Sequence, residues 1–162
     1  MHVRDALPTD ETFLREMLYE AAYWRPGSDR PPREEALASA KLRAYIESWG
    51  REGDAGVVAV EAGRPCGAAW FRVFSPSAAG YGFVDEGVPE LTIAVVRERR
   101  GEGIGTMLLD RLLERARLSG LGAISLSVEP GNRARSFYER AGFERIGTND
   151  GAWTMVRRLG GG

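Results

Sequence analysis

The sequence predicts an α/β fold, in which helices flank a central, mixed and mostly antiparallel sheet. Two pairs of strand-like runs, within residues 56–74 and 143–159, are each interrupted by a short turn and predict antiparallel hairpins. A strand, a helix and a second strand between residues 89 and 128 predict one parallel pair, because a crossover helix lets the chain return in the same direction. We assign residues 1–159 to a single domain and the glycines 160–162 to a frayed tail.

The first third of the chain is predicted to hold a short strand and two helices. Residues 1–6 form the strand, and Asp10 and Glu11 supply the cap and the acidic first turn of the first helix. Its apolar residues recur at helical spacing: Phe13, Leu14, Met17, Leu18, Ala21 and Ala22. Three prolines within residues 25–32 end this helix, and a second helix is expected over residues 33–49.

The rest of the chain reads as strands and helices joined by recognisable turns. Residues 63–65 and 149–151 contain the glycines, asparagine and proline that hairpin turns favour, and residues 75–87 predict a loop. Strands are expected at 56–62, 66–74, 89–96, 123–128, 143–148 and 152–159, and helices at 105–119 and 130–141.

Composition excludes several classes of function. The 22 basic residues are balanced by 23 acidic ones, so the chain lacks the positive excess of a protein that binds nucleic acid by its backbone. It also lacks the apolar run of about 20 residues that a membrane helix needs. The first ten residues do not resemble a secretion signal, and we expect a cytoplasmic protein.

The cysteine and histidine content excludes further chemistry. Cys66 is the only cysteine and His2 the only histidine, so a disulfide or a Cys/His metal site within one chain is excluded. We therefore expect no metal. A Ser-His-Asp triad would have to use the terminal His2.

The informative segment is residues 91–109, where a strand runs through a glycine-rich turn directly into a helix. Uncovered N–H groups in such a turn and the positive end of the helix suit a phosphate or pyrophosphate, with Arg97, Arg99 and Arg100 at the entrance. Neither frame of the turn fits the dinucleotide fingerprint, and a P-loop lysine is missing. The pattern that fits is Arg-x-x-Gly-x-Gly over residues 100–105.

Three blocks, in the right order and spacing, give the chain a resemblance to the GNAT superfamily of N-acetyltransferases. Residues 3–10 (VRDALPTD) resemble the opening strand and helix of that family, and residues 93–105 resemble its acyl-CoA motif. Residues 132–143 (NRARSFYERAGF) resemble the Asn-x-x-Ala and Phe-Tyr-x-x-x-Gly-Phe segment that follows. The resemblance covers nearly the whole chain. It implies a sheet whose two parallel strands splay apart, and acetyl-CoA as the cosubstrate.

The resemblance also implies roles for individual residues. Main-chain groups of Ile93 and Val95 would bind the pantetheine arm, and the Val95 N–H would stabilise the oxyanion. Asn132 would bind the same arm, and Tyr138 would protonate the departing thiolate. The pyrophosphate would be held by Arg100 and by the N–H groups of Gly101, Gly103, Ile104, Gly105 and Thr106.

The general base is the least determined role. Glu90 is the first candidate, with Asp85 and Glu86 as alternatives, and the proton could also leave through water. In some family members the base occupies the position of Pro89, so we expect Glu90 to point to the opposite face of the sheet.

Each of the chosen residues also has an ordinary structural explanation. The three arginines could form a solvated surface, and Tyr138 could simply pack against Leu126 and Phe143. Asn132 follows Pro130 and Gly131 and would serve as a helix cap. Cys66 lies on an apolar strand and is expected to be buried and inert.

We therefore interpret the protein as an N-acetyltransferase in which a primary amine attacks acetyl-CoA directly. The acidic residues Asp85, Glu86 and Glu90, at or before the strand over 89–96, favour a cationic small-molecule or peptide amine, and a homodimer is an open alternative. Two rival functions remain: a catalytically silent CoA-binding module of the same fold and, less favoured, a nucleotide-binding oxidoreductase. The identity of the acceptor and the length of the acyl chain are not encoded in any motif we find.

Overall fold

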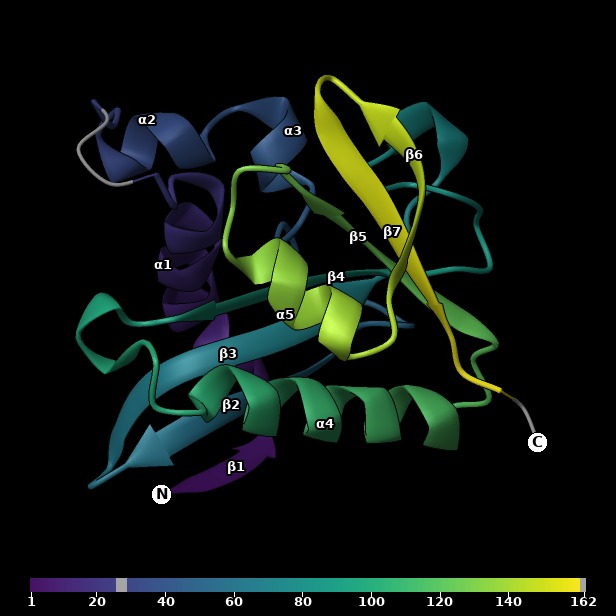
Figure 1. The fold of residues 1–162 in the computed structure, drawn as a ribbon. Helices are drawn as coiled ribbons and strands as arrows, with labels where there is room; N and C mark the ends of the chain where they lie inside the picture. The colour runs from purple at the N-terminus through teal and green to yellow at the C-terminus, as the bar shows by residue number, and fades with distance from the viewer. Residues whose placement is uncertain (26–28, 161–162) are drawn as a thin grey trace.

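The computed structural model describes residues 1–25 and 29–160, so residues 161 and 162 of the predicted tail lie outside the described residues. Within the described part, seven strands form one sheet in the order β1-β2-β3-β4-β5-β7-β6 (Figure 1). The strands are β1 His2–Asp5, β2 Ala55–Glu61, β3 Arg64–Arg72, β4 Glu90–Val95, β5 Ala123–Val128, β6 Glu144–Asn149 and β7 Ala152–Arg158. The helices are α1 Glu11–Ala22, α2 Arg33–Leu37, α3 Ala40–Arg43, α4 Ile104–Leu118 and α5 Ala134–Arg140.

Both predicted hairpins are confirmed. β2 pairs with β3 and β6 pairs with β7, each in antiparallel register. In the second hairpin Asp150 and Gly151 have φ angles of +51° and +82°, the left-handed conformation that tight hairpin turns require. The turn chemistry of this segment therefore determined its pairing locally.

The predicted parallel pair is also present, but it is very short. β4 and β5 are in register at Glu90 and Ser125, where the Ser125 N–H donates to the Pro89 carbonyl at 2.9 Å. Beyond this point the two strands separate, while β4 stays paired with β3 and β5 with β7. The sheet consequently opens into a gap between the C-terminal halves of β4 and β5.

Helices cover both faces of the sheet, with α4 and α5 on one face and α1, α2 and α3 on the other (Figure 1). Alternate side chains of β2 enter the two cores: Val57 packs on the α4 side and Val58 on the α1 side. Burial on both faces explains why this strand reads as a continuous apolar run. Among the described residues, none of the helices is long and apolar enough to cross a membrane.

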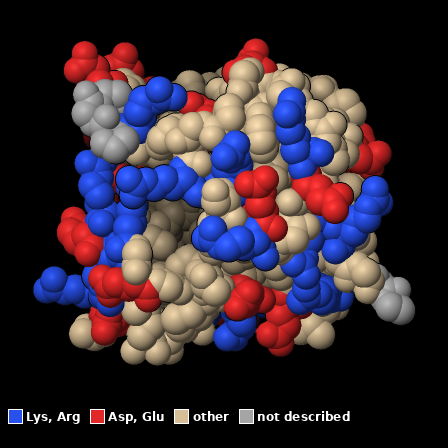
Figure 2. Space-filling model, viewed as in Figure 1, with Lys and Arg blue, Asp and Glu red and all other residues tan. Residues whose placement is uncertain are grey.

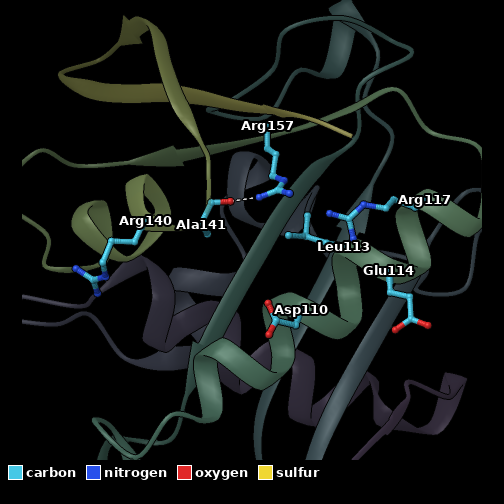
Figure 3. Close-up of a pocket in the computed structure, with 7 residues that line it drawn as sticks. All are labelled: Asp110, Leu113, Glu114, Arg117, Arg140, Ala141 and Arg157. Atoms are coloured by element: carbon cyan, nitrogen blue, oxygen red, sulfur yellow. Dashed lines mark hydrogen bonds between the residues drawn. The ribbon is translucent and has the colours of Figure 1, made fainter. Parts of the chain in front are cut away.

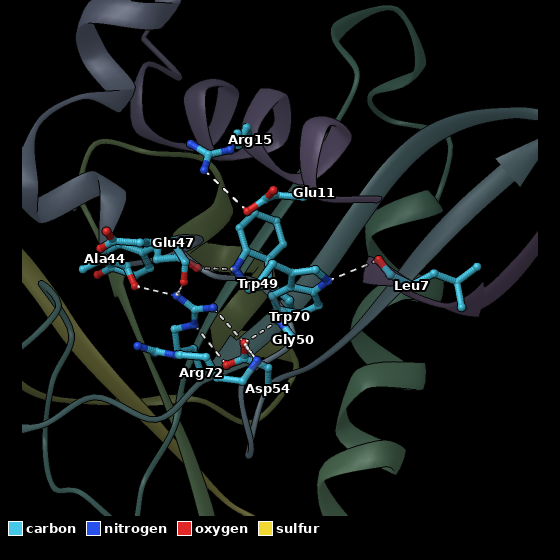
Figure 4. Close-up of polar contacts among 12 residues, drawn as sticks. Leu7, Glu11, Arg15, Ala44, Glu47, Trp49, Gly50, Asp54, Trp70 and Arg72 are labelled. Carbon is cyan, nitrogen blue, oxygen red and sulfur yellow. Dashed lines mark hydrogen bonds and ion pairs between the residues drawn. The ribbon is translucent and has the colours of Figure 1, made fainter. Parts of the chain in front are cut away.

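The single helix predicted over residues 33–49 is wrong. The structure has two short helices, α2 and α3, followed by turns. Ser39 begins α3, since its hydroxyl accepts a hydrogen bond from the Leu42 N–H at 3.3 Å. Further along, the carbonyls of Ala44 and Glu47 accept hydrogen bonds from Arg72 on β3, at 3.1 and 2.6 Å (Figure 4). A distant arginine thus binds the Ala44 carbonyl, which a helix continuing to residue 49 would use internally, together with the Glu47 carbonyl.

Arg72 also makes the most deeply buried ion pair that the described residues contain. Its Nε and Nη2 atoms donate to Asp54 at 3.0 and 2.7 Å, and the two side chains are 1% and 2% exposed (Figure 4). Asp54 also accepts hydrogen bonds from the N–H groups of Gly50 and Arg51. This pair ties the turns after α3 to the end of β3.

Removal of the carboxylate in Asp54→Ala is expected to lower the free energy of unfolding by about 3–5 kcal/mol, because a buried guanidinium would lose its counter-charge. Arg43→Ala is the control, since it breaks the exposed pair of Arg43 with Glu47 and should cost less than about 1 kcal/mol. Urea denaturation of both variants measures the difference. Equal losses would contradict the assignment of Arg72 and Asp54 as the anchor of this region.

Candidate functional site

Backbone groups of β4 line the gap between β4 and β5. The Val96 N–H donates to the Cys66 carbonyl on β3 at 2.9 Å, whereas the Pro89 carbonyl accepts from β5. Because successive peptide groups of a strand point in opposite directions, the N–H and carbonyl groups of Ile93 and Val95 face the gap. These are two of the residues that the sequence nominated.

The glycine-rich turn lies at the open end of this gap and leads into α4. Gly101 and Gly103 have φ angles of +83° and +85°, and Gly103 is the residue before the first helical turn. A Cβ atom added at either glycine would meet nothing within 4 Å, so the outer side of the turn is open. The first N–H groups of α4 have no partners within the helix, and the positive end of its dipole lies here. The turn is therefore a site where an anion would be stabilised.

The three arginines near this turn have protein partners in the structure. Arg97 and Arg100 both approach Oε2 of Glu20 on α1, at 3.5 and 3.4 Å, and Arg30 reaches the same oxygen at 3.4 Å. Arg100 also donates from Nε to the Val95 carbonyl at 3.2 Å. Three guanidinium groups around one carboxylate leave an excess of positive charge. Figure 2 shows Lys and Arg side chains bordering a hollow in this face of the protein.

Arg99 does not belong to this group. It pairs with Glu61 at the end of β2 and with Glu102, so its charge is already matched. The sequence placed Arg99 at the entrance with Arg97 and Arg100, but in the structure its carboxylate partners are different from theirs. Its ion pairs connect the turn to the end of β2.

Tyr138 lies on α5, with its ring packed edge-on to Phe143 at 5.7 Å between centroids. Its side chain is buried, and burial raises the pKa of the phenol well above its usual value. Within the part of the chain that the structure describes, its hydroxyl has no hydrogen-bond partner. The ring therefore packs against Phe143, as expected from the sequence, and the hydroxyl is available to bond to a ligand.

Asn132, the predicted cap, lies one residue before Arg133, which is the N-cap of α5, and bonds to the first residue of the helix. Its Oδ1 accepts a hydrogen bond from the Ala134 N–H at 2.9 Å. The side-chain amide N–H groups take no part in that bond and can donate elsewhere.

Glu90 is enclosed on the α1 face of the sheet, opposite to the face that its neighbour Leu91 enters. The side chain is 2% exposed, and its carboxylate accepts a hydrogen bond from the Tyr45 hydroxyl. Burial raises the pKa of Glu90 to about 7, although the hydrogen bond from Tyr45, the backbone of Gly82 and the charge of Lys41 oppose the shift. The carboxylate is therefore almost completely enclosed by protein atoms.

The alternative bases lie in an exposed turn before β4. Asp85 accepts a hydrogen bond from the Gly87 N–H at 2.8 Å and forms a bridge with Val88, so its carboxylate stabilises the turn. Glu86 is exposed beside it. Among the described residues, no hydrogen bond or ion pair holds either carboxylate at the gap.

A second concave region lies away from the gap, between α4, the end of α5 and β7. It has a volume of about 560 Å³ and is lined by charged side chains of both signs (Figure 3). Arg157 donates there to the Ala141 carbonyl. None of the residues that the sequence nominated lines this groove, and we do not assign it to the candidate site.

Sequence reasoning missed Glu20 and Tyr45. Glu20 lies on α1, 80 residues before Arg100, and Tyr45 lies 45 residues before Glu90, so no local spacing links these partners. A usable signal existed for the region around Glu90. The Gly80-Tyr81-Gly82 sequence is typical of a backbone segment that approaches another chain segment closely.

Comparisons with known proteins agree with this geometry. The model of the acetyltransferase (GNAT) family matches residues 15–143. The L-methionine sulfoximine/L-methionine sulfone acetyltransferase of Pseudomonas paraeruginosa is 33% identical over 122 residues, which cover 70% of this chain and 68% of the relative.

Solved structures share the fold. The paia N-acetyltransferase of Thermoplasma acidophilum, solved in complex with coenzyme A, has a TM-score of 0.71 at 19% identity, covering 98% of this chain and 99% of its own. The phosphinothricin acetyltransferase of Sinorhizobium meliloti, in complex with AcCoA, has a TM-score of 0.66 at 24% identity, covering 99% and 89%.

Proposed function

The chain belongs to the acetyltransferase (GNAT) family, and on this premise we propose that it transfers the acetyl group of acetyl-CoA directly to the amine of a small, amino-acid-like acceptor. The observation that carries the proposal is the gap between β4 and β5, which ends beside the glycine-rich turn and the start of α4. Acetyl-CoA supplies an activated thioester. The protein would bind and orient this thioester, allow the acceptor amine to lose a proton, and protonate the departing thiolate.

The turn would hold the pyrophosphate of acetyl-CoA. The open side of Gly101 and Gly103 leaves room for it, and the N–H groups of Ile104, Gly105 and Thr106 start α4. Arg100 would contribute its charge by leaving Glu20, since a pyrophosphate carries more negative charge than one carboxylate.

The gap would hold the pantetheine arm against β4. An arm that starts at the turn meets Val95 first and Ile93 two residues further in, with Asn132 donating from the α5 side. The thioester, at the inner end of the arm, would lie toward Ile93. We propose that the gap-facing N–H groups of Val95 and Ile93 include the donor to the developing oxyanion, and such a donor is worth about 3 kcal/mol.

The proton steps would use Tyr138 and water. The raised pKa of Tyr138 keeps its hydroxyl protonated over the working pH range, as an acid for the thiolate must be. The enclosure of Glu90 supports loss of the acceptor's proton through water rather than directly to that carboxylate. Cys66 is buried, and burial raises the pKa of its thiol, which supports direct attack without an acyl-enzyme.

The acceptor class rests on charge and on the relative. Once Arg100 has moved to the pyrophosphate, the guanidinium groups of Arg30 and Arg97 still outnumber the one carboxylate they share, Glu20, which suits an acceptor with a carboxylate better than a polycationic amine. The relative that is 33% identical is named for acetylating two methionine derivatives. The homodimer stays an open alternative, and the cytoplasmic location stays a prediction.

Calorimetric titration with acetyl-CoA, with NAD and ATP as controls, tests the binding step. We expect micromolar affinity for acetyl-CoA alone. Release of CoA thiol is then measured with L-methionine sulfone, L-methionine sulfoximine and, as a cationic comparison, spermidine. We expect turnover with the first two. Binding without transfer to any amine would instead favour a silent CoA-binding module, and absence of binding would refute the proposal.

A further inference from the structure

A short segment of chain, Gly80–Phe83, lies directly on the junction where β4 and β5 part. A Cβ atom added at Gly82 would lie 2.6 Å from the backbone of Leu126 on β5, and one added at Gly80 would lie 2.4 Å from Oε1 of Glu90. The Ser125 hydroxyl donates to the Gly82 carbonyl at 2.8 Å. Two glycines thus let this backbone seal the inner end of the gap on the α1 face.

Tyr45 links this segment to the start of β4. Its hydroxyl donates to the Glu90 carboxylate and accepts from the Tyr81 N–H at 2.8 Å, while the two tyrosine rings stack at 6.5 Å between centroids. On the other side, the Asn149 amide donates to the Tyr81 carbonyl at 3.0 Å. Tyr81 is therefore held through its backbone by the turn after α3 and by the tip of the β6–β7 hairpin.

Glu90, at the start of β4, binds the Tyr45 hydroxyl with only one of its two carboxylate oxygens. Oε2 is bonded to Tyr45, whereas Oε1 is buried against the backbone near Gly80 and Gly82, with no hydrogen bond of ordinary geometry among the described residues. Its cross-strand neighbour Arg72 is already neutralised by Asp54. Lys41 stands at the rim of the segment, with its ammonium 4.6 Å from the centre of the Tyr81 ring. The carboxylate therefore acts mainly on Tyr45.

We propose that Tyr45 and Glu90 are positioning residues, which hold Gly80–Phe83 as the wall of the acceptor pocket and so set the affinity for the amine without contacting it. The inference rests on the proposed function, because the acetyl group would reach this inner end of the gap. It assigns Glu90 a role other than that of the predicted base.

The first test measures the wall itself and needs no substrate. In Tyr45→Phe, the Tyr81 N–H loses its acceptor, and we expect its hydrogen exchange to accelerate about tenfold or more, while amides within α4 exchange as before. Tyr19→Phe is the matched control, because it removes a hydroxyl from the same core that bonds to the Pro31 carbonyl instead. Unchanged exchange at Tyr81 in Tyr45→Phe would overturn the proposal.

The second test separates the acceptor from the cofactor. With L-methionine sulfone as the acceptor, Tyr45→Phe should raise the KM for the amine about tenfold and leave the KM for acetyl-CoA within about twofold. Equal increases in both KM values would indicate a general structural role and overturn the proposal. If the wild-type enzyme does not turn over this amine, the proposed acceptor class fails, and the exchange experiment still decides whether Tyr45 holds the segment.

The third test uses Glu90→Gln, which keeps a hydrogen-bond acceptor for Tyr45 but removes the ionisation. Since the pKa of Glu90 is raised to about 7, the ionised form that binds Tyr45 most strongly is lost as the pH falls below that value. The acceptor kcat/KM of the wild type should therefore contain a component that rises through pH 7 and is absent in Glu90→Gln. The pH dependence that comes from ionisation of the acceptor amine should be present in both the wild type and Glu90→Gln. A kcat that falls at every pH in Glu90→Gln, with an unchanged KM for the amine, would instead identify Glu90 as the base.

Discussion

Gly103→Glu is expected to weaken acetyl-CoA binding by roughly 100-fold or more, since repulsion between unit charges about 4 Å apart is worth several kcal/mol near a protein surface. The substitution adds a carboxylate to the open side of the turn, where a Cβ atom meets nothing within 4 Å and no neighbour forces it elsewhere. It also places a non-glycine residue at φ +85°, which costs about 1–2 kcal/mol of stability.

Gly120→Glu is the control that separates these effects. Gly120 follows the other end of α4, has a φ of +78° and also has open space around a built Cβ. The variant therefore carries the same charge and a similar backbone strain, at a position far along the helix from the turn. Calorimetry with acetyl-CoA should show loss of binding in Gly103→Glu alone. Wild-type affinity in Gly103→Glu would show that the turn does not bind acetyl-CoA. Equal losses of affinity in both variants would show that the loss comes from destabilisation of the fold.

Tyr138→Phe is expected to lower kcat on the order of 100-fold, the lower end of what a positioned proton donor contributes. The affinity for acetyl-CoA should hardly change. The free energy of unfolding should stay within about 0.5 kcal/mol, because the buried ring is retained and no hydrogen bond to the described residues is lost. Steady-state kinetics combined with urea denaturation measures both quantities.

Phe143→Leu is the matched control for packing. It disturbs the aromatic contact with Tyr138 and leaves the hydroxyl in place, so it should cost about 1 kcal/mol of stability while kcat stays close to that of the wild type. A Tyr138→Phe variant with full turnover would mean that Tyr138 only packs. A pH dependence of kcat is informative too: because burial raises the pKa of Tyr138, no loss of activity from its ionisation should occur below about pH 10.

Local chemistry explains the elements that were predicted correctly. The turn at Asp150 and Gly151 requires left-handed backbone, and the residues present adopt it readily, so the last hairpin could be read without knowing its neighbours. The glycines at 101 and 103 likewise imply a turn with uncovered N–H groups before a helix. Over residues 33–49 the prediction failed for two reasons: Ser39 is extended and caps α3, and beyond α3 Arg72, from a strand far along the chain, binds the carbonyls of Ala44 and Glu47.

The candidate site divides in the same way. The gap-facing positions of Ile93 and Val95, the turn at Gly103 and the packing of Tyr138 follow from strand alternation, glycine conformation and helix spacing, which act over a few residues. These local preferences do not predict which charged side chains form ion pairs with one another. Arg99 is neutralised by Glu61, Arg97 and Arg100 share Glu20, and Glu90 is enclosed by Tyr45.

The sequence by itself therefore determined the strands and their order along the chain, the glycine-rich turn before α4, and the family. Only the tertiary structure decided which ionisable groups are exposed, paired or buried, including the burial of Glu90 and its hydrogen bond from Tyr45. The physical reason is that backbone preferences are set by near neighbours. The charge state of a side chain depends instead on desolvation and on partners that folding brings from tens of residues away.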